Sequence, residues 1–418
     1  MSGPGTEASR HARAAEEMLE LLEELAAFSA PGEGITRLLY TPEWSRAQSF
    51  LKERMETLGL SAYADGVGNV FGRLPGTEED GRVILTGSHI DTVVSGGRYD
   101  GAYGVASGIA ALAHLRRTYG PPRRTLEAVS FAEEEGSRFP LTFWGSGHVA
   151  GRYAGPEAAA VSDASGIALK HAMEDCGFGG YSPGSLKRSD IAAYIELHIE
   201  QGITLERTGT EIGIVTAIAG QRRYEVRLTG SANHAGTTPM GLRRDGLAGA
   251  AEMLAHLEHC ALEAGDPLVA TAGRLDVKPN TSNVIPGEVS FSLDIRHSDE
   301  AELERFCAAV AADFGQIAAR RGLGLELIPR LRAQPAPMDA PLCASIEAVC
   351  GRQGRPSRRM VSGAGHDAQL LAPRCRAAMI FVPSRDGISH SPLEHTPPEE
   401  LAAGLDVLIG LLYELAYR

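Results

Sequence analysis

Four short apolar runs place the strongest limit on how this chain can fold. They are rich in Val, Ile and Phe and span residues 82–86, 126–132, 191–197 and 378–382. Short uninterrupted runs of this kind are typical of strands that are buried on both faces of a mostly parallel sheet. A helical pattern over residues 104–117 joins the first two runs. The sequence therefore predicts a βαβ unit within an α/β fold.

The middle of the chain follows a different pattern. Tyr224, Val226 and Leu228 alternate with polar residues, and strands and helices are predicted from residue 223 to residue 331 in the order βαββαβ. This order is that of a ferredoxin-like α+β domain. We therefore predict a discontinuous α/β domain of residues 1–213 and 330–418, interrupted by an inserted α+β domain of residues 214–329. Helical patterns at residues 8–28 and 398–417 are predicted to open and close the α/β domain.

Charge and cysteine content limit the partners of the chain. Its formal net charge is −13, which disfavours nucleic acid and anionic membrane surfaces because both need a basic face. The polar N-terminus lacks an apolar signal segment, and no apolar run is long enough to cross a bilayer. The six cysteines include no Cys-x-x-Cys pair, so neither a disulfide framework nor a zinc ribbon is indicated. These features predict a cytoplasmic protein.

Each of the four apolar runs is followed by residues that can bind a metal ion. In chain order these residues are His89, Asp91 and Asp100, then Glu133, Glu134 and Glu135, then His198, and finally His390. The carboxyl ends of parallel strands meet at one edge of a sheet, so we expect these side chains to converge. Imidazole and carboxylate donors suit zinc, manganese or cobalt. Three histidines with one aspartate and one glutamate make five ligands, which exceed the three that one catalytic zinc uses, so the pattern predicts two ions that share a carboxylate.

Two acidic positions call for roles other than metal binding. Asp91 lies two residues beyond His89, where it can accept the second ring N–H of that His and fix its tautomer. Three adjacent glutamates cannot all crowd one ion, so one can bind metal while a neighbour acts as the general base on water.

Each of these features has an ordinary structural explanation when it is taken alone. A single His after a strand is usually a structural residue, and adjacent glutamates often begin a solvated helix. The joint occurrence of the donors after four separate runs favours a metal site instead. His256 and His259 also resemble a ligand pair, but they lie away from the predicted strand ends. We predict that these two are surface residues.

The inserted domain carries a polar cluster of its own. The loops at residues 231–239 and 280–287 are rich in hydrogen-bond donors and contain His234 and Asn283, and Arg296 lies on the strand that follows. An Arg and an Asn together can clamp a substrate carboxylate. For Arg296, a surface salt bridge is an equally good explanation.

The motifs together resemble those of the di-metal amidases of the aminoacylase and carboxypeptidase superfamily. The matching segments are residues 87–91, 133–139, 198–202, 234–240, 282–287 and 387–392. Within that superfamily the set is similar to the branch of N-carbamoyl-L-amino-acid hydrolases, β-ureidopropionases and allantoate amidohydrolases, and the resemblance covers nearly the whole chain. Segments 35–44, 135–140, 143–146 and 220–224 are most similar to the allantoate-hydrolysing members.

The resemblance implies a role for each candidate residue. One divalent ion would be held by His89, Asp100 and His198, and the other by Asp100, Glu135 and His390. Glu134 would be the base, Asp91 would also be catalytic, and His234 would reach the active site of a partner subunit. The resemblance thus implies a homodimer joined through the inserted domain, which would also act as a lid. The substrate would be held by Gln201, His234, Asn283, Arg296 and Gly365.

The reaction implied by the resemblance is hydrolysis of a ureido C–N bond in a small carboxylate. With allantoate, the products would be ureidoglycine or ureidoglycolate, ammonia and carbon dioxide. Manganese is the implied metal, with zinc or cobalt as alternatives. Alternative substrates are N-carbamoyl-L-amino acids, N-carbamoyl-β-alanine, dipeptides or acyl amino acids. A metal-loaded binding protein without catalysis is a further alternative, but such a protein would need no base at Glu134.

Overall fold

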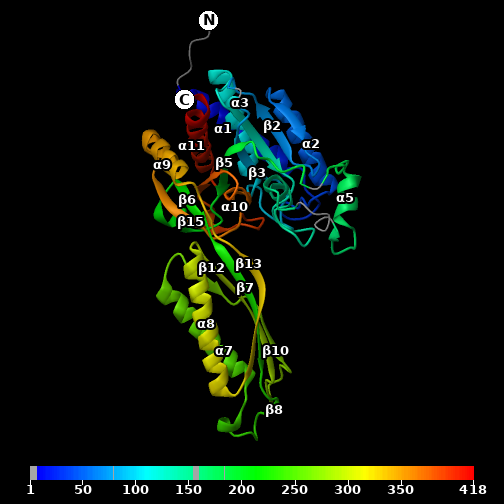
Figure 1. Cartoon of the computed structure of the whole chain (residues 1–418), viewed down its shortest axis with the longest axis vertical. Helices are drawn as coiled ribbons and strands as arrows, with labels where there is room; N and C mark the ends of the chain where they lie inside the picture. Colours follow the sequence, from blue (N-terminus) through cyan, green and yellow to red (C-terminus); the bar gives the residue numbers. More distant parts are fainter. Residues whose placement is uncertain (1–6, 79, 154–159, 183) are drawn as a thin grey trace. The chain divides into compact units, whose positions relative to one another are not determined.

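The computed structural model describes residues 7–78, 80–153, 160–182 and 184–418 (Figure 1). These residues divide into two compact units. The first unit comprises the described part of residues 1–216 together with residues 338–360 and 365–418. The inserted unit comprises residues 217–337 and 361–364.

The larger sheet has nine strands in the order β1-β2-β4-β3-β5-β16-β6-β14, with β15 beside β6. Their bounds are Ser61–Ala64 (β1), Val70–Leu74 (β2), Val83–His89 (β3), Thr125–Phe131 (β4), Ile191–Ile199 (β5), Ile212–Ile218 (β6), Ala336–Pro337 (β14), Ser357–Ser362 (β15) and Arg376–Val382 (β16). The central strands β4, β3, β5 and β16 run parallel to one another. Each includes all or nearly all of one apolar run, so the predicted mostly parallel central sheet is confirmed. Strands β1, β2, β6 and β14 pair in antiparallel fashion and were not predicted.

Helices and one-turn segments accompany these strands. They are α1 (Glu7–Ala26), α2 (Pro42–Thr57), α3 (Ala102–Tyr119), α4 (Trp144–Ala150), α5 (Leu169–Asp175), α6 (Thr204–Thr208), α9 (Ala340–Gln353), α10 (Asp367–Leu371), η3 (Arg385–Gly387) and α11 (Pro398–Tyr417). Helix α3 joins β3 to β4, and fourteen of its residues, from Ala102 to Leu115, are buried. The predicted βαβ unit is thus present. Among the described residues, no helix is both long and apolar enough to cross a membrane.

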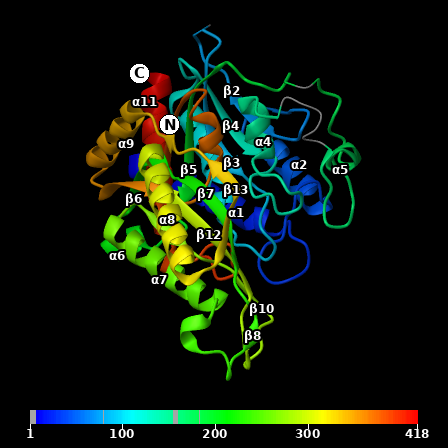
Figure 2. The same ribbon diagram turned by 60° about the horizontal axis from the view of Figure 1, so that its bottom comes forward.

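The inserted unit is built on an antiparallel sheet of five strands, in the order β10-β12-β7-β13 with β9 beside β12. Its elements are β7 (Gly220–Thr229), β8 (Asn233–His234), η2 (Met240–Leu242), α7 (Gly246–Ala264), β9 (Val269–Thr271), β10 (Leu275–Lys278), β11 (Val284–Ile285), β12 (Glu288–His297), α8 (Glu300–Arg321) and β13 (Gly324–Ala333). Asp245 and Asp299 cap α7 and α8 by accepting backbone N–H bonds. Both helices pack against the sheet through an apolar core that includes Val226, Phe291 and Phe314 (Figure 2).

Two details of the inserted unit differ from the sequence prediction. The second strand of the predicted βαββαβ order is divided into β9 and β10 around Gly273, a residue type that weakens a strand interior. The predicted domain boundaries after residues 213 and 329 both fall inside strands, β6 and β13. Strand β13 continues past Pro329 because a register shift between Pro329 and Leu331 accommodates the proline.

Candidate metal centre

The four parallel strands bring the predicted donors to one edge of the sheet. His89 is the last residue of β3, and His198 lies near the end of β5. Glu133, Glu134 and Glu135 follow the end of β4, and His390 lies in the loop that follows β16 and η3. Because these strands run in the same direction, their carboxyl ends share one edge, as the sequence predicted.

Two groups of donor atoms lie close enough to hold a metal ion each. His89, Asp100 and His198 form one group, and Asp100, Glu135 and His390 form the other; within each group all donor atoms lie within 4.8 Å of one another. Oδ1 of Asp100 lies 3.2 Å from Nε2 of His198 and 3.8 Å from Nε2 of His89. Oδ2 of Asp100 lies 3.1 Å from Nε2 of His390. Asp100 therefore offers a different oxygen to each group.

Asp91 connects the first donor to the glutamate segment. Its Oδ1 lies 3.2 Å from Nδ1 of His89, which leaves Nε2 of that ring directed to the donor group. The same carboxylate accepts the backbone N–H groups of Glu134 at 3.0 Å and Glu135 at 3.2 Å. Asp91 is 1% exposed, so water does not compete for these bonds. It is a positioning residue for both a histidine and the glutamates.

The electrostatics of the group favour a bound cation. Burial raises the pKa of Glu134 well above its usual value, and the neighbouring Glu135 adds to the effect while His89 opposes it. Burial would lower the pKa of His89, but Asp91 and nearby carboxylates outweigh it and raise that pKa. Hydrogen bonds to Asp100 and Glu135 raise the pKa of His390 to about 10. Carboxylates that repel one another beside imidazoles that hold protons fit a site for divalent cations.

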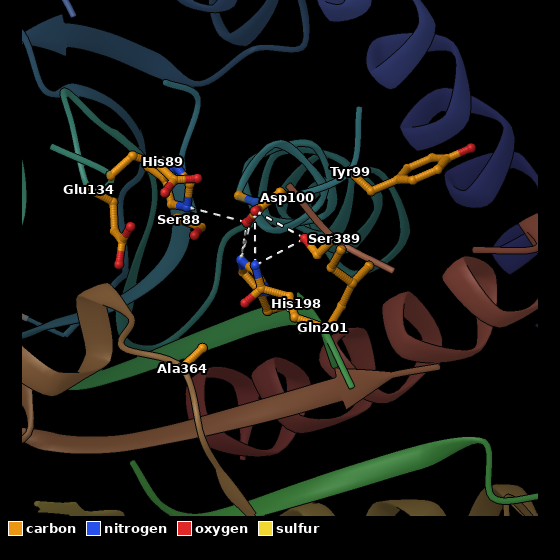
Figure 3. A network of polar contacts seen from close by, with 12 residues as sticks. Ser88, His89, Tyr99, Asp100, Glu134, His198, Gln201, Ala364 and Ser389 are labelled. Carbon is orange, nitrogen blue, oxygen red and sulfur yellow. Dashed lines mark hydrogen bonds and ion pairs between the residues drawn. The ribbon is translucent and has the colours of Figure 1, made fainter. Parts of the chain in front are cut away.

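Two residues that support the donors, Glu394 and Ser389, were not predicted. Gln201, which was predicted to hold substrate, also contacts a donor. Glu394, 5% exposed, accepts the backbone N–H groups of Tyr99 at 2.9 Å and Asp100 at 3.2 Å. Its other oxygen accepts the hydroxyl of Ser389 at 2.8 Å. Gln201 donates through Nε2 to Oδ2 of Asp100 at 2.9 Å and to Ser389 at 3.1 Å (Figure 3). The loops that carry Asp100 and His390 are therefore joined through one buried carboxylate.

Two candidates of the first unit remain. Neither Glu134 nor Gly365 forms a hydrogen bond with Asp100 among the described contacts. The side chain of Glu134 lies beside His89 and apart from Asp100 (Figure 3). Gly365 lies between β15 and α10, where an added Cβ would come within 3.1 Å of the Phe143 ring. A side chain at position 365 would therefore disturb its neighbours.

The candidate residues of the inserted unit are more exposed. His234 on β8 and Asn283 before β11 are exposed, and the backbone N–H of Ala235 donates to the carbonyl of Asn283 at 2.9 Å. Arg296 pairs with Asp294 through two bonds, from Nε at 2.9 Å and from Nη2 at 3.0 Å. Its Nη1 donates to the carbonyl of Gly363 at 2.7 Å. Arg296 thus has a surface partner, which was one of the two explanations that the sequence left open.

A cavity of about 790 Å³ adjoins Arg296 on the sheet of the inserted unit. Arginine side chains in its lining are Arg223, Arg274, Arg296 and Arg330. Arg223 pairs with Asp294, and Arg330 pairs with Glu225. The cavity can therefore present several guanidinium groups to an anion, although their charge is partly balanced by these carboxylates.

Comparisons with known proteins agree with this geometry. Residues 85–414 match the model of peptidase family M20/M25/M40. The chain is 49% identical to an allantoate amidohydrolase of Bacillus subtilis, over 95% of this chain and 97% of that one. It is 46% identical to an allantoate amidohydrolase of Escherichia coli, over 96% and 97% of the two chains.

Comparison with solved structures indicates the same family. A hydantoinase/carbamoylase family amidase from Burkholderia multivorans superposes with a TM-score of 0.92 at 35% identity, over 97% of this chain and 98% of that one. The match to the family model covers most of the chain, and both relatives match it almost end to end. The chain therefore belongs to peptidase family M20/M25/M40, and it is an amidohydrolase of that family.

Proposed function

We propose that this chain hydrolyses allantoate at one ureido C–N bond with the help of two divalent metal ions. The arrangement of Asp100 carries the two-metal part of the proposal, because its two oxygens face separate donor groups. The similarity to two allantoate amidohydrolases over nearly their full lengths supports the choice of substrate. The products are ammonia, carbon dioxide and ureidoglycine or ureidoglycolate.

The donors fit the two ions in number, type and placement. His89, Asp100 and His198 would hold one ion, and Asp100, Glu135 and His390 would hold the other. When bound, two such ions polarise the ureido carbonyl and lower the pKa of a water molecule toward about 7. Manganese suits donor groups that combine imidazole with several carboxylates, and zinc or cobalt suits them as well.

Proton transfer falls to Glu134. Asp91 accepts the backbone N–H of Glu134 and so holds this glutamate beside His89. The carboxylate of Glu134 takes a proton from the attacking water and returns it to the leaving nitrogen. Glu135 serves as a metal ligand, so the two adjacent glutamates have different tasks.

Four residues bind and orient the substrate in this proposal: Gln201, Asn283, Arg296 and Gly365. Arg296 binds the carboxylate of allantoate in place of one of its bonds to Asp294, because a guanidinium matches a carboxylate in bidentate geometry. His234 stabilises the oxyanion that forms at the attacked carbon.

His234 performs this role in the site of a partner subunit. The inserted unit acts as the lid and as the dimerisation domain of a cytoplasmic homodimer, and its order of strands and helices supports a ferredoxin-like fold. Mixing His234→Ala protein with Glu134→Gln protein tests this arrangement. Each mixed dimer contains one site with both groups intact, so part of the activity returns. If subunits exchange and no activity returns, His234 acts within its own subunit.

Comparison of substrates tests the proposed function most directly. We expect manganese-loaded protein to release ammonia from allantoate with a higher kcat/KM than from N-carbamoyl-L-methionine or N-carbamoyl-β-alanine. A pocket that hydrogen-bonds the second ureido group rejects an aliphatic replacement, because its polar groups are left unpaired. The Glu134→Gln protein, purified in the same way, controls for contaminating enzymes. Faster hydrolysis of either carbamoyl compound would overturn the assignment of allantoate.

A further inference from the structure

A second group of metal-binding side chains lies between the two helices of the inserted unit. It consists of His256 and Cys260 on α7 and Asp313 on α8, and its three donor atoms all lie within 4.8 Å of one another. His256 and Cys260 are four residues apart, so they lie on the same face of α7. Helices α7 and α8 are adjacent elements of this unit (Figures 1 and 2). The group shares no residue with the metal centre of the first unit.

The distances around His256 are close to those that a tetrahedral zinc site requires. Nε2 of His256 lies 2.9 Å from Oδ2 of Asp313 and 3.4 Å from Sγ of Cys260. Zinc bonds of about 2.0–2.1 Å to nitrogen and oxygen and about 2.3 Å to sulfur imply separations of about 3.3 Å for N···O and about 3.5 Å for N···S. The two distances to His256 therefore lie within a few tenths of an ångström of tetrahedral values, and the donor atoms of Cys260 and Asp313 lie within 4.8 Å of each other.

The surroundings of Cys260 also favour a cation. Burial raises the pKa of the Cys260 thiol, and the carboxylates of Asp313 and Glu263 raise it further. The same carboxylates attract a divalent cation, and a bound cation converts a coordinating thiol to the thiolate. The side chains of His256 and Asp313 are 33% and 38% exposed, so a metal ion and a completing water molecule can reach the group.

A pairing between helices accounts for part of this arrangement. His256 and Asp313 alone form a hydrogen-bonded pair of a kind that is common on protein surfaces. The pairing of His256 with Asp313 does not explain why a thiol lies beside the same ring nitrogen. The thiol of Cys260 adds a third donor of the type that zinc prefers. His259, predicted to be a surface residue together with His256, does point to the surface and pairs with Glu263 at 3.4 Å. His256 is also partly exposed, at 33%, and its ring pairs with Asp313.

We propose that His256, Cys260 and Asp313 form a zinc-type metal site that joins α7 to α8. A water molecule completes the tetrahedron, as in other sites with three protein ligands. The ion stabilises the helix pair of the inserted unit and takes no part in hydrolysis. This proposal does not depend on the proposed function, because the site lies outside the metal centre of the first unit.

Cobalt provides a specific test because the donor groups of the first unit contain no cysteine. We expect full-length protein loaded with Co²⁺ to show a thiolate-to-cobalt charge-transfer band in the near ultraviolet. The band should disappear in Cys260→Ser, weaken in His256→Gln and persist in the control variant Cys176→Ser, whose half-buried cysteine lies in the first unit. The absence of the band with excess cobalt, or its persistence in Cys260→Ser, would overturn the proposal.

Alkylation of the wild-type protein provides a second test that needs no variant. Zn²⁺ should slow the reaction of Cys260 with iodoacetamide, measured by peptide mass, while Cys176 serves as the internal reference. Equal reactivity of Cys260 with and without Zn²⁺ would contradict the site even if the variants failed to fold. Hydrolysis of allantoate by Cys260→Ser should match that of the wild type, which separates this site from the catalytic one.

Discussion

The donors of the first unit and the polar residues of the inserted unit differ in how firmly they are held. Asp91, Asp100 and Glu394 are at most 5% exposed, and each has several hydrogen-bond partners. His234 and Asn283 are exposed, and Arg296 is engaged with Asp294. Asp100 and the residues that support it are thus held firmly, although the donor His390 is 50% exposed. The proposed substrate-binding residues of the inserted unit must change partners or gain them.

This difference indicates which part of the chain is held rigid. A metal centre needs donors held within a fraction of an ångström, which buried strand ends and supporting hydrogen bonds provide. A guanidinium that exchanges one carboxylate for another keeps its charge balanced in both states. Substitutions in the two regions should therefore have different consequences: loss of metal or chemistry in the first unit, and weaker substrate binding in the inserted unit.

The largest effect is expected for Glu134→Gln. The substitution removes the proton acceptor and leaves every donor of the two metal groups in place, so kcat should fall by about 10²–10⁴ with metal content unchanged. Steady-state rates and metal analysis of the same preparation test this. Near-normal turnover by the variant would show that another group is the base.

A smaller effect is expected for Glu394→Gln. The amide keeps the shape of the side chain, but its NH2 end cannot accept. The variant therefore loses either the two bonds from the Tyr99 and Asp100 backbone N–H groups or the bond from the Ser389 hydroxyl. Loss of support around a metal ligand typically weakens metal affinity by about 10–100-fold, and equilibrium dialysis with Mn²⁺ measures this. Glu399→Gln, on the exposed first turn of α11, is the matched control. Equal affinities of both variants would remove Glu394 from this supporting role.

Protons should compete with the metal in the first unit. Hydrogen bonds to Asp100 and Glu135 raise the pKa of His390 to about 10, so this imidazole is protonated at neutral pH in the metal-free protein. The metal must displace that proton, and the apparent affinity should therefore rise by up to about tenfold per pH unit until the pH approaches this pKa. Calorimetry in buffers of different ionisation enthalpy should detect a released proton. Binding without proton release would show that His390 is neutral before metal arrives.

The mildest effect is expected in the inserted unit, for Arg296→Ala. A charge-assisted bond to substrate contributes about 1.5 kcal/mol at a partly exposed site, or about tenfold in KM, with kcat nearly unchanged. Arg274→Ala provides the control, because Arg274 lines the same cavity and pairs with the exposed Asp276. A similar rise in KM for both variants would point to the general positive charge of the cavity instead of a specific contact.

The sequence predicted the edge of the sheet that carries the donors because that information is local. Each apolar run sets a strand, and His89 and His198 lie at or next to the last residue of their strands. The antiparallel outer strands were missed because short strands such as β1, with exposed residues on both sides, lack a clear apolar pattern.

Contacts between distant segments were harder to predict. Glu394 supports backbone N–H groups that lie almost three hundred positions away, and no spacing in the sequence indicates such a bond. The pairing of Arg296 with Asp294 had a signal, because residues two apart share a face of a strand. The spacing of His256 and Cys260 on one helix face was likewise visible, but the third donor, Asp313, comes from another helix.

The central claim is that Asp100 joins two metal ions in the first unit. Metal analysis after dialysis against Mn²⁺ tests it directly, in the Cys260→Ser background so that the site between α7 and α8 does not contribute. Without further change, and also with Glu134→Gln, the protein should hold both ions. His390→Ala should lose one ion, and Asp100→Ala should lose both, because each donor group contains Asp100. Full occupancy by two ions in Asp100→Ala would contradict the account.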